Sequence, residues 1–155
     1  MFWPVVFLIL LTLFSPALLE AQAPGSFFLR VEGREEQKVL LELPVQSGEF
    51  FFYQYIHSSD RTPVRDTFRI DEGGKMILVE EAFLWHGAGL EFQAHGDVQV
   101  SHADRWTRVR LNRAFPSLPI RVGRIAQQTL IIQGKSFPLD QIGKPGECLI
   151  LSLSP

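Results

Sequence analysis

Hydrophobic and polar side chains alternate along most of the chain with the two-residue period of a β-strand. The clearest case is the stretch 64–70, where every second residue is apolar except Asp66 and the residues between them are polar or charged. Successive side chains of a strand point to opposite faces, so one face of this strand is expected to be buried. Asp66 is predicted to lie on that buried face.

Similar stretches, separated by turn-forming residues, occur throughout 24–155. Strands are expected at 27–31, 38–45, 50–56, 64–70, 75–83, 106–112, 129–133, 136–139 and 147–153. Two further candidates for short strands are 120–125 and part of the polar segment 95–105. Beyond the first residues of the chain, no apolar pattern of period 3.6 persists long enough for a helix. The chain therefore predicts an all-β fold, a single antiparallel β-sandwich or small barrel of about eight to ten short strands.

Residues 50–70 combine the densest aromatic run of the chain with its most concentrated polar chemistry, and they are interpreted as a hairpin. A turn at Asp60-Arg61 places Tyr55 opposite Asp66 and His57 opposite Val64. A carboxyl group among apolar side chains needs hydrogen-bond partners, because desolvation disfavours its charged form. We expect Asp66 to bond to Tyr55, His57 or a loop amide, or to face a cavity.

Two interpretations of the hairpin follow. In the first, Tyr55, His57 and Asp66 form a buried network that stabilises the hairpin, and the hydroxyl and carboxylate groups of the loop close the turn. In the second, the same residues line a polar pocket at the end of the sheet, with Arg61 or Arg65 available for a small anion and His57 as a titrating group.

Recognised catalytic and metal motifs do not fit the chain. His57 and Ser58 are neighbours, so on a strand they point to opposite faces, and no Gly-x-Ser-x-Gly sequence is present. The four histidines, at 57, 86, 95 and 102, have no recognised ligand spacing. We therefore expect no metal and no cofactor. An enzyme of unrecognised type, using His57 and Asp66 as an acid-base pair, is kept as an alternative.

The first residues indicate export. An apolar run over 5–19 is followed by Ala21-Gln22-Ala23, which fits the small-x-small pattern at a signal peptidase site. No Lys or Arg precedes the run and Pro24 follows the expected cut, so 1–23 is interpreted either as a cleaved signal peptide or as an uncleaved membrane anchor. The remaining residues, 24–155, are expected to form one all-β domain, periplasmic or anchored to the cytoplasmic membrane and facing outward.

Composition narrows the possible partners. The formal net charge is −2, so no overall field favours nucleic acid, and none is expected as a partner. Cys148 is the only cysteine, and an intrachain disulfide is therefore impossible.

In 106–112, Trp106, Arg108 and Arg110 alternate with apolar residues and predict a basic, aromatic strand face. If the hairpin motif is purely structural, this face is the alternative interaction surface.

The hairpin motifs resemble those of a bacterial family known only as domain of unknown function 1850. Residues 55–58 match its Tyr-x-His-Ser and 62–64 its Thr-Pro-Val, Asp66 and Phe68 match an acid and a Phe that follow, and 87–90 match a Gly-Ala-Gly-Leu. The candidate binding residues are accordingly Tyr55, His57, Ser58, Thr62, Arg65, Asp66, Gly87 and Gly89.

This sequence departs from the family pattern at two positions. The acid is more often Glu than Asp, and Glu91 stands where a Pro usually follows the Leu. The resemblance implies a small exported or membrane-tethered protein without an established activity. Such proteins are often encoded beside tripartite (TRAP-type) transporters that import carboxylates, which implies a membrane transporter or its binding protein as the partner. An exported accessory or binding module is therefore the first hypothesis.

Overall fold

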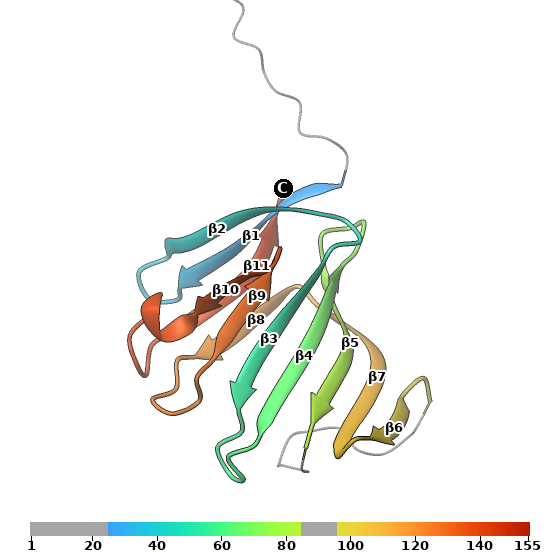
Figure 1. Cartoon of the computed structure of the whole chain (residues 1–155). Helices are drawn as coiled ribbons and strands as arrows, with labels where there is room; N and C mark the ends of the chain where they lie inside the picture. The colour runs from blue at the N-terminus through green and yellow to red at the C-terminus, as the bar shows by residue number, and fades with distance from the viewer. Residues whose placement is uncertain (1–24, 85–95) are drawn as a thin grey trace, which may run out of the picture.

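The computed structural model describes residues 25–84 and 96–155, and strands make up most of that part of the chain (Figure 1). Its eleven strands and single 3-10 turn, η1, are β1 (Ser26–Gly33), β2 (Lys38–Gln46), β3 (Phe50–Ile56), β4 (Pro63–Ile70), β5 (Met76–Phe83), β6 (Gln99–Ala103), β7 (Trp106–Phe115), β8 (Ser117–Arg121), β9 (Thr129–Ile132), β10 (Lys135–Pro138), η1 (Leu139–Gln141) and β11 (Cys148–Ser154). No helix in these residues is long and apolar enough to cross a membrane.

The strands form two antiparallel sheets that enclose one hydrophobic core. The smaller sheet has the order β2-β1-β11-β8 and the larger one the order β10-β9-β3-β4-β5-β7-β6 (Figure 1). Buried side chains of both sheets belong to the same cluster, among them Leu29 and Leu151 from the smaller sheet and Phe51 from the larger. The predicted all-β antiparallel sandwich is confirmed, and the sheets do not close into a barrel.

The strand β8 differs from the prediction. We expected a strand at 120–125, whereas β8 begins at Ser117, contains Pro119 and ends at Arg121. Pro119 is tolerated because β8 lies at the edge of its sheet, where a missing backbone N–H leaves no ladder bond broken. Only Pro116 separates β7 from β8, so the chain passes from the larger sheet to the smaller one in a single residue.

The register of the central hairpin also differs from the prediction. Asp66 lies opposite Tyr53, not Tyr55, and Tyr55 lies opposite Val64. His57 follows the end of β3, where its N–H donates to the Thr62 carbonyl at 2.9 Å. The six-residue connection 57–62 closes on itself and moves the pairing by two residues. A shift of two residues keeps each side chain on its predicted face, so Asp66 still points inward.

A β-bulge at Val79 changes the phase of β5. Leu78 pairs with Phe68 while Glu80 pairs with the adjacent Thr67, which leaves Val79 as the extra residue. We expected regular alternation through this strand. Instead, the bulge turns Glu81 toward the inside of the sandwich, on the face of Leu78, and turns Glu80 outward. Bulges of this kind redirect a side chain next to functional sites.

The core between the sheets depends on stacked aromatic rings. The rings of Phe51 and Phe68 are parallel within 6°, with centroids 5.0 Å apart, and Phe115 meets Phe68 edge-on at 6.1 Å. Aromatic pairs in these geometries add to the free energy gained by burial alone. The side chains come from β3, β4 and β7, so the cluster joins strands on both sides of the bulge.

We predict that Phe68→Ala lowers the free energy of unfolding by about 3 to 5 kcal/mol, because Phe68 is only 2% exposed and its loss leaves a cavity. Phe50→Ala is the matched control, since Phe50 is 49% exposed in the neighbouring strand. Denaturant titration measures both. Equal losses in the two variants would contradict the assigned core.

Candidate functional site: a polar cleft between the sheets

A cleft of about 290 Å³ lies between β8 and the inner face of the larger sheet. In the view of Figure 1, β8 passes behind β3, and side chains from both strands line the cleft. Its lining residues are Tyr53, Tyr55, Asp66, Phe68, Leu78, Glu81, Arg113, Phe115, Leu118, Pro119, Ile120, Arg121 and Gln128. A volume near 300 Å³ is at the lower end of the range for small-molecule sites.

Two carboxyl groups face this cleft from neighbouring strands. Asp66 on β4 and Glu81 on β5 are cross-strand partners, so their side chains lie side by side on the same face. Oδ1 of Asp66 is buried and has no hydrogen-bond partner in the described residues. Burial, and then the negative charge of Glu81, raises the pKa of Asp66 from its ordinary value of 3.8 to about 8. At neutral pH Asp66 is therefore mainly a neutral acid.

Two tyrosines complete the wall beside the acids. The rings of Tyr53 and Tyr55 are 5.2 Å apart at 31°. Burial raises the pKa of both phenols, and the nearby charge of Asp66 raises it further. Gln128 Nε2 donates to the Tyr53 hydroxyl oxygen at 2.9 Å. Because that bond uses the oxygen as an acceptor, the Tyr53 O–H proton is directed elsewhere.

Gln128 holds the connection between β8 and β9 against the larger sheet. Besides its bond to Tyr53, its Nε2 donates to the Arg121 carbonyl at 3.0 Å, and its Oε1 accepts from the Gly123 N–H at 2.8 Å. One amide side chain therefore ties the end of β8 to β3, which fixes the width of the cleft on that side. The sequence carried no sign of this role, because Gln128 lies in a connection between strands.

Arginines stand at the rim of the cleft. Arg113 and Arg121 both line it and are both exposed. Nη1 of Arg121 donates to the Gly146 carbonyl at 2.8 Å, so that guanidinium is oriented by the backbone. The cleft thus has carboxyl groups on its floor and positive charge at its opening. The carboxylate of Glu81 accepts hydrogen bonds, and the neutral carboxyl group of Asp66 keeps acceptor capacity beside its O–H, so the floor suits a ligand with donor groups.

The structure separates His57 from this cleft. His57 Nδ1 lies 2.9 Å from Ser59 Oγ and 3.4 Å from Asp60 Oδ1, inside the turn that follows β3. The Thr62 N–H donates to the same Asp60 oxygen at 3.2 Å. His57 is not one of the described residues that line the cleft, whereas Asp66 is. Residues 57–62 therefore form their own hydrogen-bonded turn.

The remaining candidate residues lie in three places. Tyr55 lines the cleft with Asp66, and Ser58 is exposed in the turn. Arg65 points to the opposite face of the sheet, where its guanidinium carbon lies 5.4 Å from the centre of the Phe52 ring. Gly87 and Gly89 fall outside the described residues. The site includes Tyr53, Glu81, Arg113, Arg121 and Gln128, which were not among the candidates.

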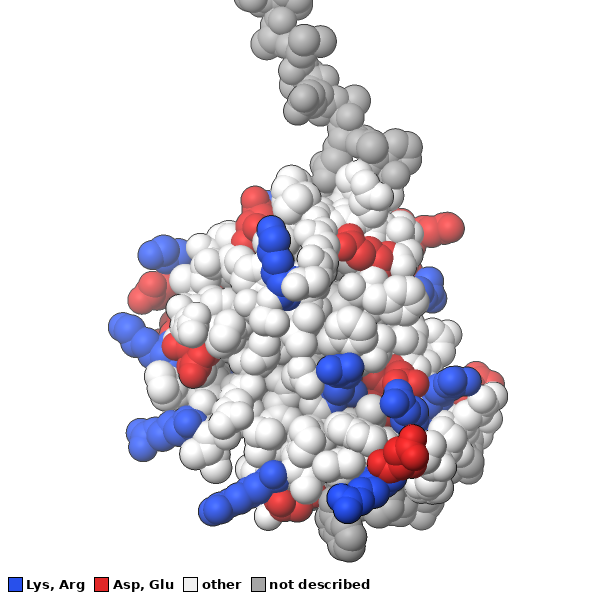
Figure 2. All heavy atoms as spheres, in the orientation of Figure 1, with Lys and Arg blue, Asp and Glu red and all other residues white. Residues whose placement is uncertain are grey.

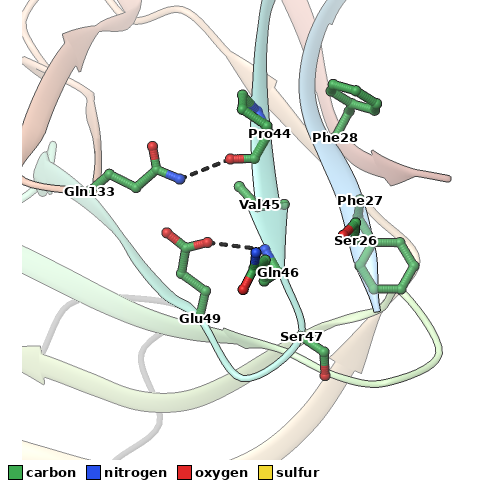
Figure 3. Close-up of a pocket in the computed structure, with 9 residues that line it drawn as sticks. All are labelled: Ser26, Phe27, Phe28, Pro44, Val45, Gln46, Ser47, Glu49 and Gln133. Atoms are coloured by element: carbon green, nitrogen blue, oxygen red, sulfur yellow. Dashed lines mark hydrogen bonds between the residues drawn. The ribbon is translucent and has the colours of Figure 1, made fainter. Parts of the chain in front are cut away.

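A second cavity, of about 660 Å³, lies where β1 and β2 meet the start of β3 (Figure 3). Gln133 Nε2 donates to the Pro44 carbonyl at 2.8 Å, and Glu49 Oε2 accepts from the Gln46 N–H at 3.0 Å. Figure 3 shows both side chains pointing to β2. These polar groups join the backbone of β2 to neighbouring segments, so this cavity offers less convergent chemistry than the cleft.

The fold and the cleft define a class of protein, an open antiparallel β-sandwich with a polar site between its sheets. The chain belongs to the family described as "Domain of unknown function (DUF1850)", whose model matches residues 51–139. That range includes both cleft acids, the two tyrosines and Gln128. No curated protein and no solved structure matches the chain. In the described residues, no group of three or more His, Cys, Asp or Glu side chains is placed to hold a metal ion.

We predict that the cleft acid makes stability depend on pH. With a pKa near 8 in the folded chain and near 3.8 in the unfolded chain, Asp66 binds a proton only in the folded state between those values, so stability falls as pH rises between them. Asp66→Asn removes this titration and keeps the shape of the side chain. Between pH 5 and pH 8, the free energy of unfolding of the wild type should fall by at least about 1 kcal/mol more than that of Asp66→Asn.

Denaturant titrations of both proteins across that pH range measure the difference, and titrating groups that do not interact with Asp66 cancel in the comparison. Parallel stability curves for the two proteins would show that the carboxyl group of Asp66 is not held in its neutral form.

Proposed function

We propose that the protein is an exported, non-enzymatic binding module of the cell envelope, with the cleft between the sheets as its ligand site. The observation that supports this most is the carboxyl pair of Asp66 and Glu81 in an open cleft, with one buried oxygen that has no partner in the described residues. A buried polar oxygen without a hydrogen-bond partner costs free energy. A ligand that supplies the partner removes that cost.

The chemistry of the floor favours a small ligand that donates hydrogen bonds. Hydroxyl, amide and ammonium groups all donate to a carboxyl oxygen. A small anion, which the sequence suggested for the hairpin region, meets the negative charge of Glu81 here, and like charges at short range oppose its binding. The rim residues Arg113 and Arg121 attract a negative group only at the opening.

Binding is proposed in preference to catalysis because of where His57 lies. An acid-base pair needs both groups to converge on one site with a further stabilising group. His57 is bonded to Ser59 within the turn, and Asp66 lines the cleft. The alternative of an enzyme based on this pair therefore has no support in the geometry.

The cellular setting rests on the sequence. The apolar run in 1–23 supports export, and the resemblance of the hairpin motifs supports a role beside a TRAP-type solute transporter. In this proposal the domain stands outside the cytoplasmic membrane and assists the transporter or its binding protein. Association of this kind is not an activity in itself, so the cleft and the partner need separate tests.

We predict that a donor-bearing probe binds in the cleft. Sorbitol, propionamide and putrescine represent hydroxyl, amide and ammonium donors, and isothermal titration of the full chain in mild detergent measures their binding. Glu81→Gln should lower the affinity for the probe that binds most tightly by about tenfold. This is the effect of losing roughly 1.4 kcal/mol of a charge-assisted hydrogen bond.

Glu80→Gln is the matched control, because it makes the same change on the next residue of β5, whose side chain points to the other face. It should leave the affinity within about twofold. No binding by any of the three probes, or an equal loss in both variants, would count against the cleft as the ligand site.

We also predict that the full chain, crosslinked in native membranes, captures an integral membrane transporter component identified by mass spectrometry. His57→Ala tests whether the hairpin turn takes part, since it removes the side chain bonded to Ser59, and it should lower the yield. Recovery of no membrane protein by either form would remove the support for a transporter role.

A further inference from the structure

The outer face of the larger sheet carries a groove between two arginines. Gln54, Arg65, Ala82 and Arg108 are successive cross-strand neighbours on β3, β4, β5 and β7. Strands in a sheet are about 4.8 Å apart, so the arginines flank the alanine from either side. Ala82, which is 5% exposed, has only a methyl group and lines a hollow together with both arginines.

This arrangement leaves a hollow of about 360 Å³ on the sheet surface. Its lining residues are Gln54, Pro63, Arg65, Ala82, Trp106 and Arg108. Trp106, two residues before Arg108 on β7, lines it as well. Trp and Arg are the residue types most enriched in the energetically important parts of protein interfaces.

The hollow lies in a field of positive charge. Glu80 is the acid next to it, with Arg108 Nη1 at 3.1 Å from its Oε1 and Arg110 Nε at 3.9 Å from its Oε2. One carboxylate is therefore shared by two arginines, and Arg65 adds a third positive charge. The chain as a whole has a net charge of −2, so the excess of positive charge is local to this face.

The arginines are oriented before any partner arrives. The guanidinium of Arg108 is held by Glu80, and that of Arg65 lies over the Phe52 ring. Fixed guanidinium groups lose less conformational freedom on binding a carboxylate than free ones do. Figure 2 shows acidic and basic side chains mixed over the visible face of the molecule.

We propose that this groove docks an acidic segment of a partner protein, with a carboxylate seated above Ala82 between Arg65 and Arg108. A protein segment is favoured over a free small acid, because the hollow lies on the outer face of the sheet, Trp106 lines it beside the two arginines, and Arg65 lies over the Phe52 ring. Such surfaces gain affinity from area beyond the central contact. The groove is on the opposite face of the sheet from the cleft, and the proposal does not depend on a cleft ligand.

The test uses a fluorescein-labelled peptide of alternating Asp and Ser and an uncharged peptide in which Asn replaces Asp. Fluorescence anisotropy with the full chain in mild detergent measures both. The acidic peptide should bind at least about tenfold more tightly than the neutral one and should weaken as salt rises. Arg65→Gln combined with Arg108→Gln should abolish the difference between the peptides.

Arg124→Gln is the control, because Arg124 is an exposed arginine in the connection between β8 and β9. Its affinity for the acidic peptide should stay within about twofold of the wild type. Thermal unfolding of each variant shows that the fold is retained, and Ala82→Val fills the hollow without changing charge and should also weaken binding.

Three results would overturn the proposal. The first is equal binding of the acidic and neutral peptides, and the second is an equal loss in the control and in the double variant. The third is arginine-dependent binding of succinate without binding of the acidic peptide, which would make the groove a site for small dicarboxylates instead.

Discussion

The bulge at Val79 is the constraint on which the chemistry of the larger sheet depends. Without the extra residue, the alternation that buries Leu78 would bring Glu80 inward and turn Glu81 to solvent. With it, Glu81 joins Asp66 on the floor of the cleft, and Glu80 meets Arg108 on the outer surface. One unpaired residue therefore decides which acid is desolvated and which acid is held in an ion pair.

The same sheet carries chemistry on both faces because its strands present adjacent residues in opposite directions. Asp66 and Arg65 are neighbours on β4, and Glu81 and Ala82 are neighbours on β5. The cleft and the outer groove are therefore built back to back on the same strands.

The acidic groups that give the cleft its chemistry also lower the stability of the fold. A carboxyl group whose buried oxygen has no partner among the described residues destabilises the fold, and a second acid beside it adds repulsion when both are ionised. The stacked rings of Phe51 and Phe68, directly next to the cleft on the inner face, offset part of that cost. Strained or poorly satisfied groups that persist in a packed domain are typical of functional sites.

The sequence by itself determined the antiparallel β class, most strand positions, the inward direction of Asp66 and the outward direction of Arg65, because alternation is a local property of each strand. Only the tertiary structure decided that Asp66 lies beside Tyr53 and Glu81, because register depends on how a turn closes and on where a bulge falls. It also decided that β8, with Pro119, crosses to the smaller sheet and that Gln128 closes the cleft. These features depend on contacts between segments far apart in the chain, and a local sequence pattern does not predict such contacts.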